Sequence, residues 1–142
     1  MYRLFTFFSL VLLSIFLTGC GSGKVPFSGK VIFSDDGSPL NTGTIAFVKD
    51  GKLSRGEIKE DGTFVVGTDG AADGLLPGTY QVYISARKAT PVESTGPYSD
   101  TGNYVYEELI DKKYQSPDTS GITVEVPHPT KHYELSVDRF KK

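Results

Sequence analysis

Residues 77–86 read PGTYQVYISA, and this stretch decides the fold. From its fourth residue on, every second position is apolar or small: Tyr80, Val82, Ile84 and Ala86. Such alternation is typical of a β-strand with one buried face, because successive side chains of a strand point to opposite sides. Pro77 and Gly78 are turn residues, so the stretch predicts a strand that begins at a tight bend.

The same period of two recurs along the chain. The other alternating residues are Val25, Phe27, Val31 and Phe33; Ile45 and Phe47; Phe64 and Val66; Ile122, Val124 and Val126; and Tyr133, Leu135 and Val137. Asp-Gly pairs begin at positions 36, 50, 61 and 73 and supply the positive φ of tight hairpin turns. Short strands with such turns predict an all-β protein, an antiparallel seven-strand β-sandwich of immunoglobulin-like or prealbumin-like type.

Residues 88–114, KATPVESTGPYSDTGNYVYEELIDKKY, interrupt this pattern. Only residues 104–109 look strand-like, so the sequence predicts one long loop over 88–114. Tyr98, Tyr104 and Tyr106 lie in it among Ser, Thr, Gly and Asn, a composition typical of adaptable recognition surfaces. These tyrosines are candidate ligand contacts, and the alternative is that some of them fold inward to cover an open end of the sandwich.

The first 19 residues have the composition of a signal peptide. Arg3 gives a positive start, and residues 4–17 are apolar except for two serines and one threonine. A helix of this length spans about 21 Å, well short of a hydrocarbon core of about 30 Å. The segment therefore predicts a cleaved secretory signal rather than a permanent membrane span.

Leu17-Thr18-Gly19-Cys20 ends this run and resembles the bacterial lipobox. The resemblance implies cleavage before Cys20, a diacylglycerol on its thiol and an acyl group such as palmitate on its amine. Two or more acyl chains hold a protein firmly at a membrane, whereas one is marginal. Cys20 is the only cysteine, and the alternative is an unmodified thiol after a signal peptide.

These observations divide the chain into a signal peptide (1–19), a lipid anchor with a short linker (20–24) and a β-sandwich domain (25–142). The linker residues after Cys20 reach about 14 Å at full extension, which predicts a domain close to the membrane surface. The net charge is −2 and there is no basic stretch, so we expect no nucleic-acid partner.

Several patterns in the domain resemble known families. The stretch SGKVIFSDDGSPLNTGTIAF resembles the opening of carboxypeptidase-regulatory-like domains, and EDGTF and DGLLPGTYQVYI resemble their later strands. The matching residues of the opening are Gly29, Val31, Pro39, Leu40, Gly43, Ile45 and Phe47. ELIDKKYQSPDTSGITVEV resembles the ending of small planctomycete-type lipoproteins, with Asp111 where proline is usual. The resemblance implies a transthyretin-like (prealbumin-like) sandwich lipoprotein of the cell envelope.

Enzymatic motifs are absent from the sequence. There is no G-x-S-x-G elbow, and the C-terminal Tyr-Arg-Gly-Ser signature of transthyretin-like hydroxyisourate hydrolases is replaced by DRFKK. His128 and His132 lie four apart, but Pro127 and Pro129 exclude the helix on which that spacing would share a metal. Exposed loop histidines are the favoured interpretation, with a metal site as the alternative.

Asp61, Asp69 and Asp73 are the candidate calcium ligands, because Ca²⁺ binds converging carboxylate oxygens. Their spacing does not match an EF-hand loop, and Asp before Gly is what hairpin turns use. We therefore expect no metal and no cofactor beyond the lipid on Cys20, with Ca²⁺ as the alternative.

The sequence thus predicts a non-enzymatic, membrane-anchored envelope lipoprotein with a structural or adhesive role. Its expected partners are the membrane, through the lipid, and an envelope protein or glycan. The alternatives are a carbohydrate-binding module that uses the tyrosines of the 88–114 loop and a hydrolase or metal-dependent enzyme. Gly21 follows the cysteine where some enterobacterial lipoproteins carry an inner-membrane retention Asp, so the resemblance favours the outer membrane in an organism that has one.

Overall fold

The computed structural model describes residues 23–92, 104–130 and 132–141. Its strands are β1 (Ser28–Phe33), β2 (Gly43–Lys49), β3 (Lys52–Ile58), β4 (Thr63–Val65), β5 (Gly78–Ser85), β6 (Arg87–Pro91), β7 (Tyr104–Glu108), β8 (Ile122–Val126) and β9 (Tyr133–Val137). Two short helices, η2 (Lys112–Gln115) and α2 (Pro117–Ser120), precede β8. Within the described ranges, no helix is long and apolar enough to span a membrane.

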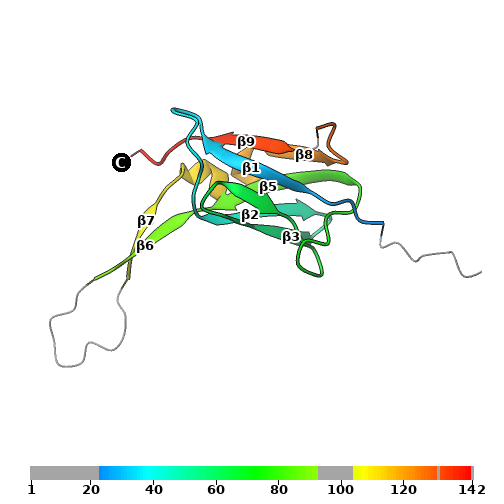
Figure 1. Ribbon diagram of the computed structural model, residues 1–142, viewed down its shortest axis with the longest axis horizontal. Coiled ribbons are helices and arrows are strands. Elements are labelled where there is room, and N and C mark those ends of the chain that lie inside the picture. Colours follow the sequence, from blue (N-terminus) through cyan, green and yellow to red (C-terminus); the bar gives the residue numbers. More distant parts are fainter. Residues whose placement is uncertain (1–22, 93–103, 131, 142) are drawn as a thin grey trace, which may run out of the picture.

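Seven of the strands form the two layers of a β-sandwich (Figure 1). One sheet has the strand order β4-β1-β9, and the other has the order β3-β2-β5-β8. The predicted seven-strand β-sandwich is therefore confirmed. β6 and β7 form a separate two-stranded hairpin that projects from one end of the sandwich.

β1 and β9 depart from the expected antiparallel arrangement, because they run parallel. Gly29 lies opposite Tyr133 at one end of the pair, and Phe33 lies opposite Val137 at the other. Parallel neighbours cannot be joined by a tight turn and need a long crossover. The crossover here is the rest of the domain, since β1 and β9 are the first and last described strands of the sandwich.

The core lies between the two sheets and is centred on Phe47. This residue of β2 is fully buried, and its ring centre lies 6.2 Å from that of Phe64, a fully buried residue of β4 in the facing sheet. Phe27 and Tyr80 also contact the Phe47 ring edge-on, at 5.3 and 6.4 Å. Aromatic groups bury large apolar areas, so this cluster contributes strongly to holding the layers together.

The turn between β2 and β3 has the geometry that its sequence requires. Asp50 and Gly51 have φ values of 50° and 74°, and the flanking Lys49 and Lys52 face each other in the ladder. Two consecutive positive φ values characterise the type I′ turns that suit the twist of a hairpin. This Asp-Gly pair is a hairpin turn, as predicted.

Residues 88–114 differ from the single long loop that the sequence predicted. β6 and β7 pair from Arg87 opposite Glu108 to Pro91 opposite Tyr104, and η2 follows them. All five residues of β6 are exposed. A strand without a buried face shows no apolar alternation, which is why β6 left no signal in the sequence.

Candidate functional site

The chain enters the sandwich at the end where β1 and β5 begin. Val25 and Leu75 exchange two backbone hydrogen bonds of 2.7 and 2.9 Å. The Lys24 ammonium donates to Asp69 at 2.6 Å and to Asp73 at 2.5 Å, and its side chain is only 10% exposed. Lys24, the last residue of the predicted linker, is thus fixed to the body of the domain.

Asp73 is the main acceptor at this entry end. Its carboxylate also accepts the backbone N–H groups of Thr68 (2.6 Å), Asp69 (3.2 Å) and Gly70 (3.1 Å). The hydrogen bond from Lys24, followed by that of Thr68, lowers the pKa of Asp73 far below its ordinary range. Hydrogen bonds to Asp69 and Asp73 in turn raise the pKa of Lys24.

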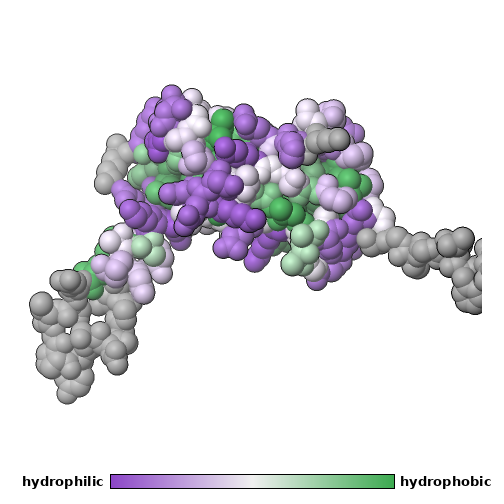
Figure 2. Space-filling model, viewed as in Figure 1, coloured by the Kyte–Doolittle hydropathy of each residue, from purple (hydrophilic) through white to green (hydrophobic). Residues whose placement is uncertain are grey.

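Exposed tyrosines lie on the hairpin, at the other end of the sandwich. Alternation along β7 places Tyr104 and Tyr106 on one face and Val105 on the opposite face. Their exposed fractions are 53%, 65% and 59% respectively. Figure 2 shows hydrophobic and weakly polar residues along the hairpin beside a largely hydrophilic stretch of the body. The hairpin thus exposes large side chains on both of its faces.

The base of the hairpin is tied to the sandwich. The Glu108 carboxylate accepts Arg87 Nε at 2.7 Å and Gln115 Nε2 at 2.6 Å, so β6, β7 and η2 meet at one side chain. The Leu109 carbonyl accepts the backbone N–H of Phe140 at 3.1 Å. These contacts fix the direction in which the hairpin leaves the body.

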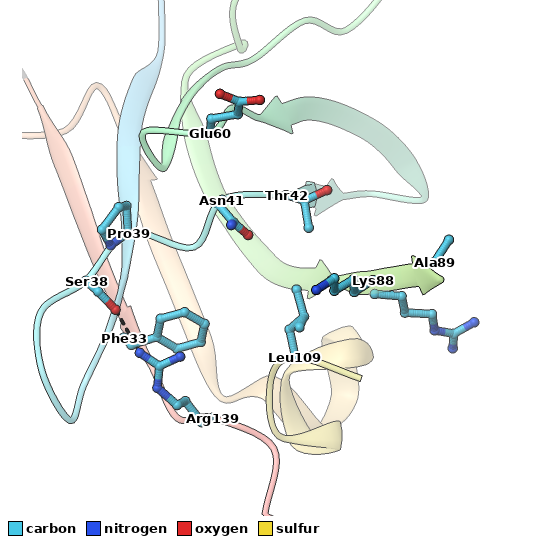
Figure 3. A pocket seen from close by; sticks show the side chains of 11 residues that line it. Phe33, Ser38, Pro39, Asn41, Thr42, Glu60, Lys88, Ala89, Leu109 and Arg139 are labelled. Atoms are coloured by element: carbon cyan, nitrogen blue, oxygen red, sulfur yellow. Dashed lines mark hydrogen bonds between the residues drawn. The ribbon is translucent and has the colours of Figure 1, made fainter. Parts of the chain in front are cut away.

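A groove of about 970 Å³ lies beside this base. The β2–β5 ladder ends where Thr44 faces Ser85, and β6 then leaves the sheet to pair with β7. The space beside β6 is bordered on one side by Ser38, Pro39, Asn41 and Thr42, and on the other by residues 87–89. Figure 3 shows Glu60 at the far side of the same opening.

Arg139 closes one end of the groove, and its charge is balanced. It donates to Asp35 at 2.7 Å and to Asp36 at 2.9 Å, and its guanidinium lies 3.7 Å from the Phe33 ring centre. It also donates to the Ser38 hydroxyl at 2.7 Å, as Figure 3 shows. Hydrogen bonds from Ser38, assisted by Arg139, lower the pKa of Asp36 to about 2.

The structure describes some of the predicted site residues but not others. Cys20 and Tyr98 lie outside the described residues. Tyr104 and Tyr106 share one exposed face of β7, and their role as ligand contacts stays a prediction. The groove was not predicted, because its residues come from separate segments of the chain that no local motif connects.

The two histidines lie in the turn before β9. The His128 ring packs edge-on against Tyr133 at 5.1 Å, and its Nδ1 lies 2.8 Å from the Thr130 hydroxyl. The same hydroxyl donates to the backbone carbonyl of His132 at 3.0 Å. His128 and His132 therefore both make contacts that stabilise the local turn.

The three aspartates considered as calcium ligands instead form hydrogen bonds in turns or ion pairs with the entry segment. Asp61 accepts the backbone N–H of Thr63 at 2.9 Å and its hydroxyl at 2.6 Å. Asp69 and Asp73 bind Lys24. In the part of the chain that the structure describes, no three His, Cys, Asp or Glu side chains are grouped to hold a metal ion.

Comparison with known proteins adds little to this description. No protein-family model matches the chain, and no curated protein matches it either. Among solved structures, a 9R-lipoxygenase from Cyanothece PCC8801 is similar at 11% identity and a TM-score of 0.38. The match covers 84% of this chain but only 16% of the lipoxygenase. The fold therefore rests on the strands and their pairing.

Proposed function

We propose that this chain is a non-enzymatic lipoprotein of the cell envelope that is held at a membrane through lipid on Cys20. Its role is structural or adhesive, and the hairpin binds an envelope partner. The observation that carries the proposal is the arrangement of the two ends. The chain enters at one end of the sandwich, and the hairpin leaves from the other (Figure 1).

The path of β5 supports this arrangement. β5 begins at Gly78, just after the Val25–Leu75 pairing at the entry end, and it leads through eight residues to the start of β6. At about 3.3 Å per residue this strand covers roughly 26 Å. A lipid on Cys20 would hold the entry end at the membrane and direct Tyr104 and Tyr106 away from it.

The Lys24 contacts strengthen the argument. Because Lys24 is bound to Asp69 and Asp73, only the segment between Cys20 and Lys24 remains as a linker. That segment spans at most about 14 Å at full extension. A tether this short limits how far the domain tilts or rotates over the surface, which suits presentation of one end to a partner. In an organism with an outer membrane, Gly21 after the cysteine favours that membrane.

The anchor is tested by fractionation of cells that express the full chain. We expect Cys20→Ala to release the protein from the membrane fraction or to leave residues 1–19 uncut. Correct cleavage together with unchanged membrane fractionation would contradict the anchor.

Binding by the hairpin is tested by photo-crosslinking in living cells. A photoreactive residue at position 104 is expected to give a discrete or smeared adduct, which mass spectrometry identifies as protein or glycan. The matched control places the same group at Leu76, which is 40% exposed and lies at the entry end. No adduct at position 104, or the same adduct from both positions, would contradict recognition by the hairpin.

A further inference from the structure

We propose that the groove at the base of the hairpin binds a neutral glycan chain, with Tyr106 as a stacking surface at its rim. The inference rests on the proposed function, because it assigns a ligand class to the end of the domain that faces away from the anchor. Five observations carry it: the polar groups in the groove, their charge balance, the neighbouring tyrosines, the character of the β6 edge and the size of the groove.

The groove presents both donors and acceptors of hydrogen bonds. Asn41, Thr42, Glu60 and Lys88 line it, and no hydrogen bond or ion pair links their side chains to other described residues. The Lys88 ammonium can only donate hydrogen bonds, and the ionised Glu60 carboxylate can only accept them. The Asn41 amide and the Thr42 hydroxyl can do both. A sugar hydroxyl also donates and accepts, so an array of hydroxyls complements this mixed lining.

The charges in the groove favour a neutral ligand over an anionic one. Arg139 is paired with two aspartates, and Arg87 is paired with Glu108. One cation, Lys88, and one anion, Glu60, remain as the charged lining groups outside these pairs. A phosphate or polyanion would meet Glu60 as a like charge, whereas a neutral polyol can hydrogen-bond to both groups.

Tyr106 does not line the groove itself, but it is the cross-strand neighbour of a residue that does. It lies directly opposite Ala89, a groove-lining residue whose small side chain leaves the ring uncovered, and Tyr104 lies opposite Pro91. The two tyrosines share a face and are about 7 Å apart along β7. Aromatic rings of this kind have an apolar face and a polar tip, which suits the apolar face and hydroxyl rim of a sugar.

A peptide strand added to the free edge of β6 is less consistent with the same residues. Strand addition needs an open edge that pairs over several residues. Only residues 87–89 of β6 border the groove, and the strand carries Lys88 and ends in Pro91. Lysine and proline on an edge strand discourage pairing with another chain.

The size of the groove fits a short stretch of glycan. Ligand sites of small molecules occupy about 300–1,000 Å³, and this groove has about 970 Å³. The volume accommodates a few sugar units, with Tyr106 available to the next unit along the chain. The bound chain would therefore run from the groove outward over the hairpin.

The test uses the full-length protein in detergent micelles on an array of immobilised neutral tetrasaccharides, including β-1,4-linked N-acetylglucosamine, glucose and mannose, with sulfated counterparts. We expect binding to at least one neutral glycan, and at least tenfold weaker binding for both Tyr106→Ala and Glu60→Gln. The matched controls are Val105→Ala, on the opposite face of β7, and Glu125→Gln, at an exposed position of β8. Both should bind the glycan with an affinity within twofold of that of the unmodified protein.

Three outcomes would overturn the inference: no binding to any neutral glycan, stronger binding to the sulfated counterparts, or equal losses in the control variants. The proposed function would fail by different results. A protein adduct at position 104 without glycan binding would support recognition by the hairpin but would make a peptide the ligand. A Cys20→Ala variant that is correctly cleaved and still membrane-bound would contradict the lipid anchor alone.

Discussion

The Lys24 ammonium and the Asp73 carboxylate lie 2.5 Å apart, although 49 positions separate them in the sequence. Asp73 also accepts three backbone N–H groups of residues 68–70, so the ion pair joins the entering chain to a folded loop. Charge-assisted hydrogen bonds of this kind are stronger than neutral ones. The contact determines where the rigid domain begins and, under the proposed function, how it stands above the membrane.

Asp73→Asn should therefore loosen the entry segment. The neutral amide loses the ion pair to Lys24, and its single oxygen accepts fewer of the backbone N–H groups. We expect a lower urea midpoint at unchanged slope and faster amide exchange at Val25. Asp69→Asn is the control, because the Asp69 side chain is 82% exposed and, among the described residues, its carboxylate is bound by Lys24 alone, so its effect should be smaller. Equal effects of the two variants would contradict this role of Asp73.

Stability should fall on acidification from about pH 4 toward pH 2. Hydrogen bonds from Ser38 lower the pKa of Asp36 to about 2, and hydrogen bonds from Lys113, then Ser34, lower the pKa of Asp138 to about 2. A depressed folded-state pKa stabilises the fold fully above the unfolded value of about 3.9, and this stabilisation is lost as pH falls through the folded value. Thermal unfolding at a series of pH values measures the effect.

Asp138→Asn removes one of these two carboxylates and should flatten the acid limb of the profile. A melting temperature that stays constant from pH 5 to pH 2 in the unmodified protein would contradict the depressed pKa values.

The strands that could be predicted are those with one apolar face. β5 alternates as its sequence indicated, with Tyr80, Val82 and Ile84 buried. β3 was missed, although three of its residues are buried, because two of them are Ser54 and Gly56. A Cβ on Gly56 would come within 2.8 Å of the Val65 carbonyl oxygen, so the close approach of β4 requires a residue that carries no apolar signal.

The site was predictable only in part, for a related reason. Exposed tyrosines among small polar residues are visible in the sequence, and Tyr104 and Tyr106 proved to share a face. The groove depends on where the β2–β5 ladder ends and β6 diverges, which brings Asn41, Glu60 and Lys88 around one opening. Pairing between distant segments of this kind has no local sequence pattern.

Gly29→Ala should disrupt the parallel pairing of β1 and β9. A Cβ on Gly29 would overlap the Tyr133 carbonyl oxygen and the Phe64 ring, so backbone and core would both have to shift. Overpacking at such sites costs about 1–3 kcal/mol. We expect a loss at the upper end of this range in the free energy of unfolding, measured in urea.

Gly70→Ala is the matched control for this substitution. Neither glycine has a positive φ, and a Cβ on Gly70 would meet its nearest neighbour, an Asp73 carboxylate oxygen, at 3.9 Å. Its free energy of unfolding should change by less than about 0.5 kcal/mol. A similar loss in both variants would contradict the close contact between β1 and β9.

Replacing the hairpin tyrosines should leave the fold intact. Tyr104 and Tyr106 are more than half exposed, so alanine at either position should change the free energy of unfolding by no more than about 0.5 kcal/mol. Tyr114 is the contrast: it is 8% exposed and its hydroxyl donates to Asp138 at 3.1 Å, so Tyr114→Ala should cost about 3–5 kcal/mol. Thermal and urea unfolding of the three variants separate tyrosines that build the sandwich from tyrosines available to a ligand. A large loss for Tyr106→Ala would instead favour the interpretation in which the hairpin covers the end of the sandwich.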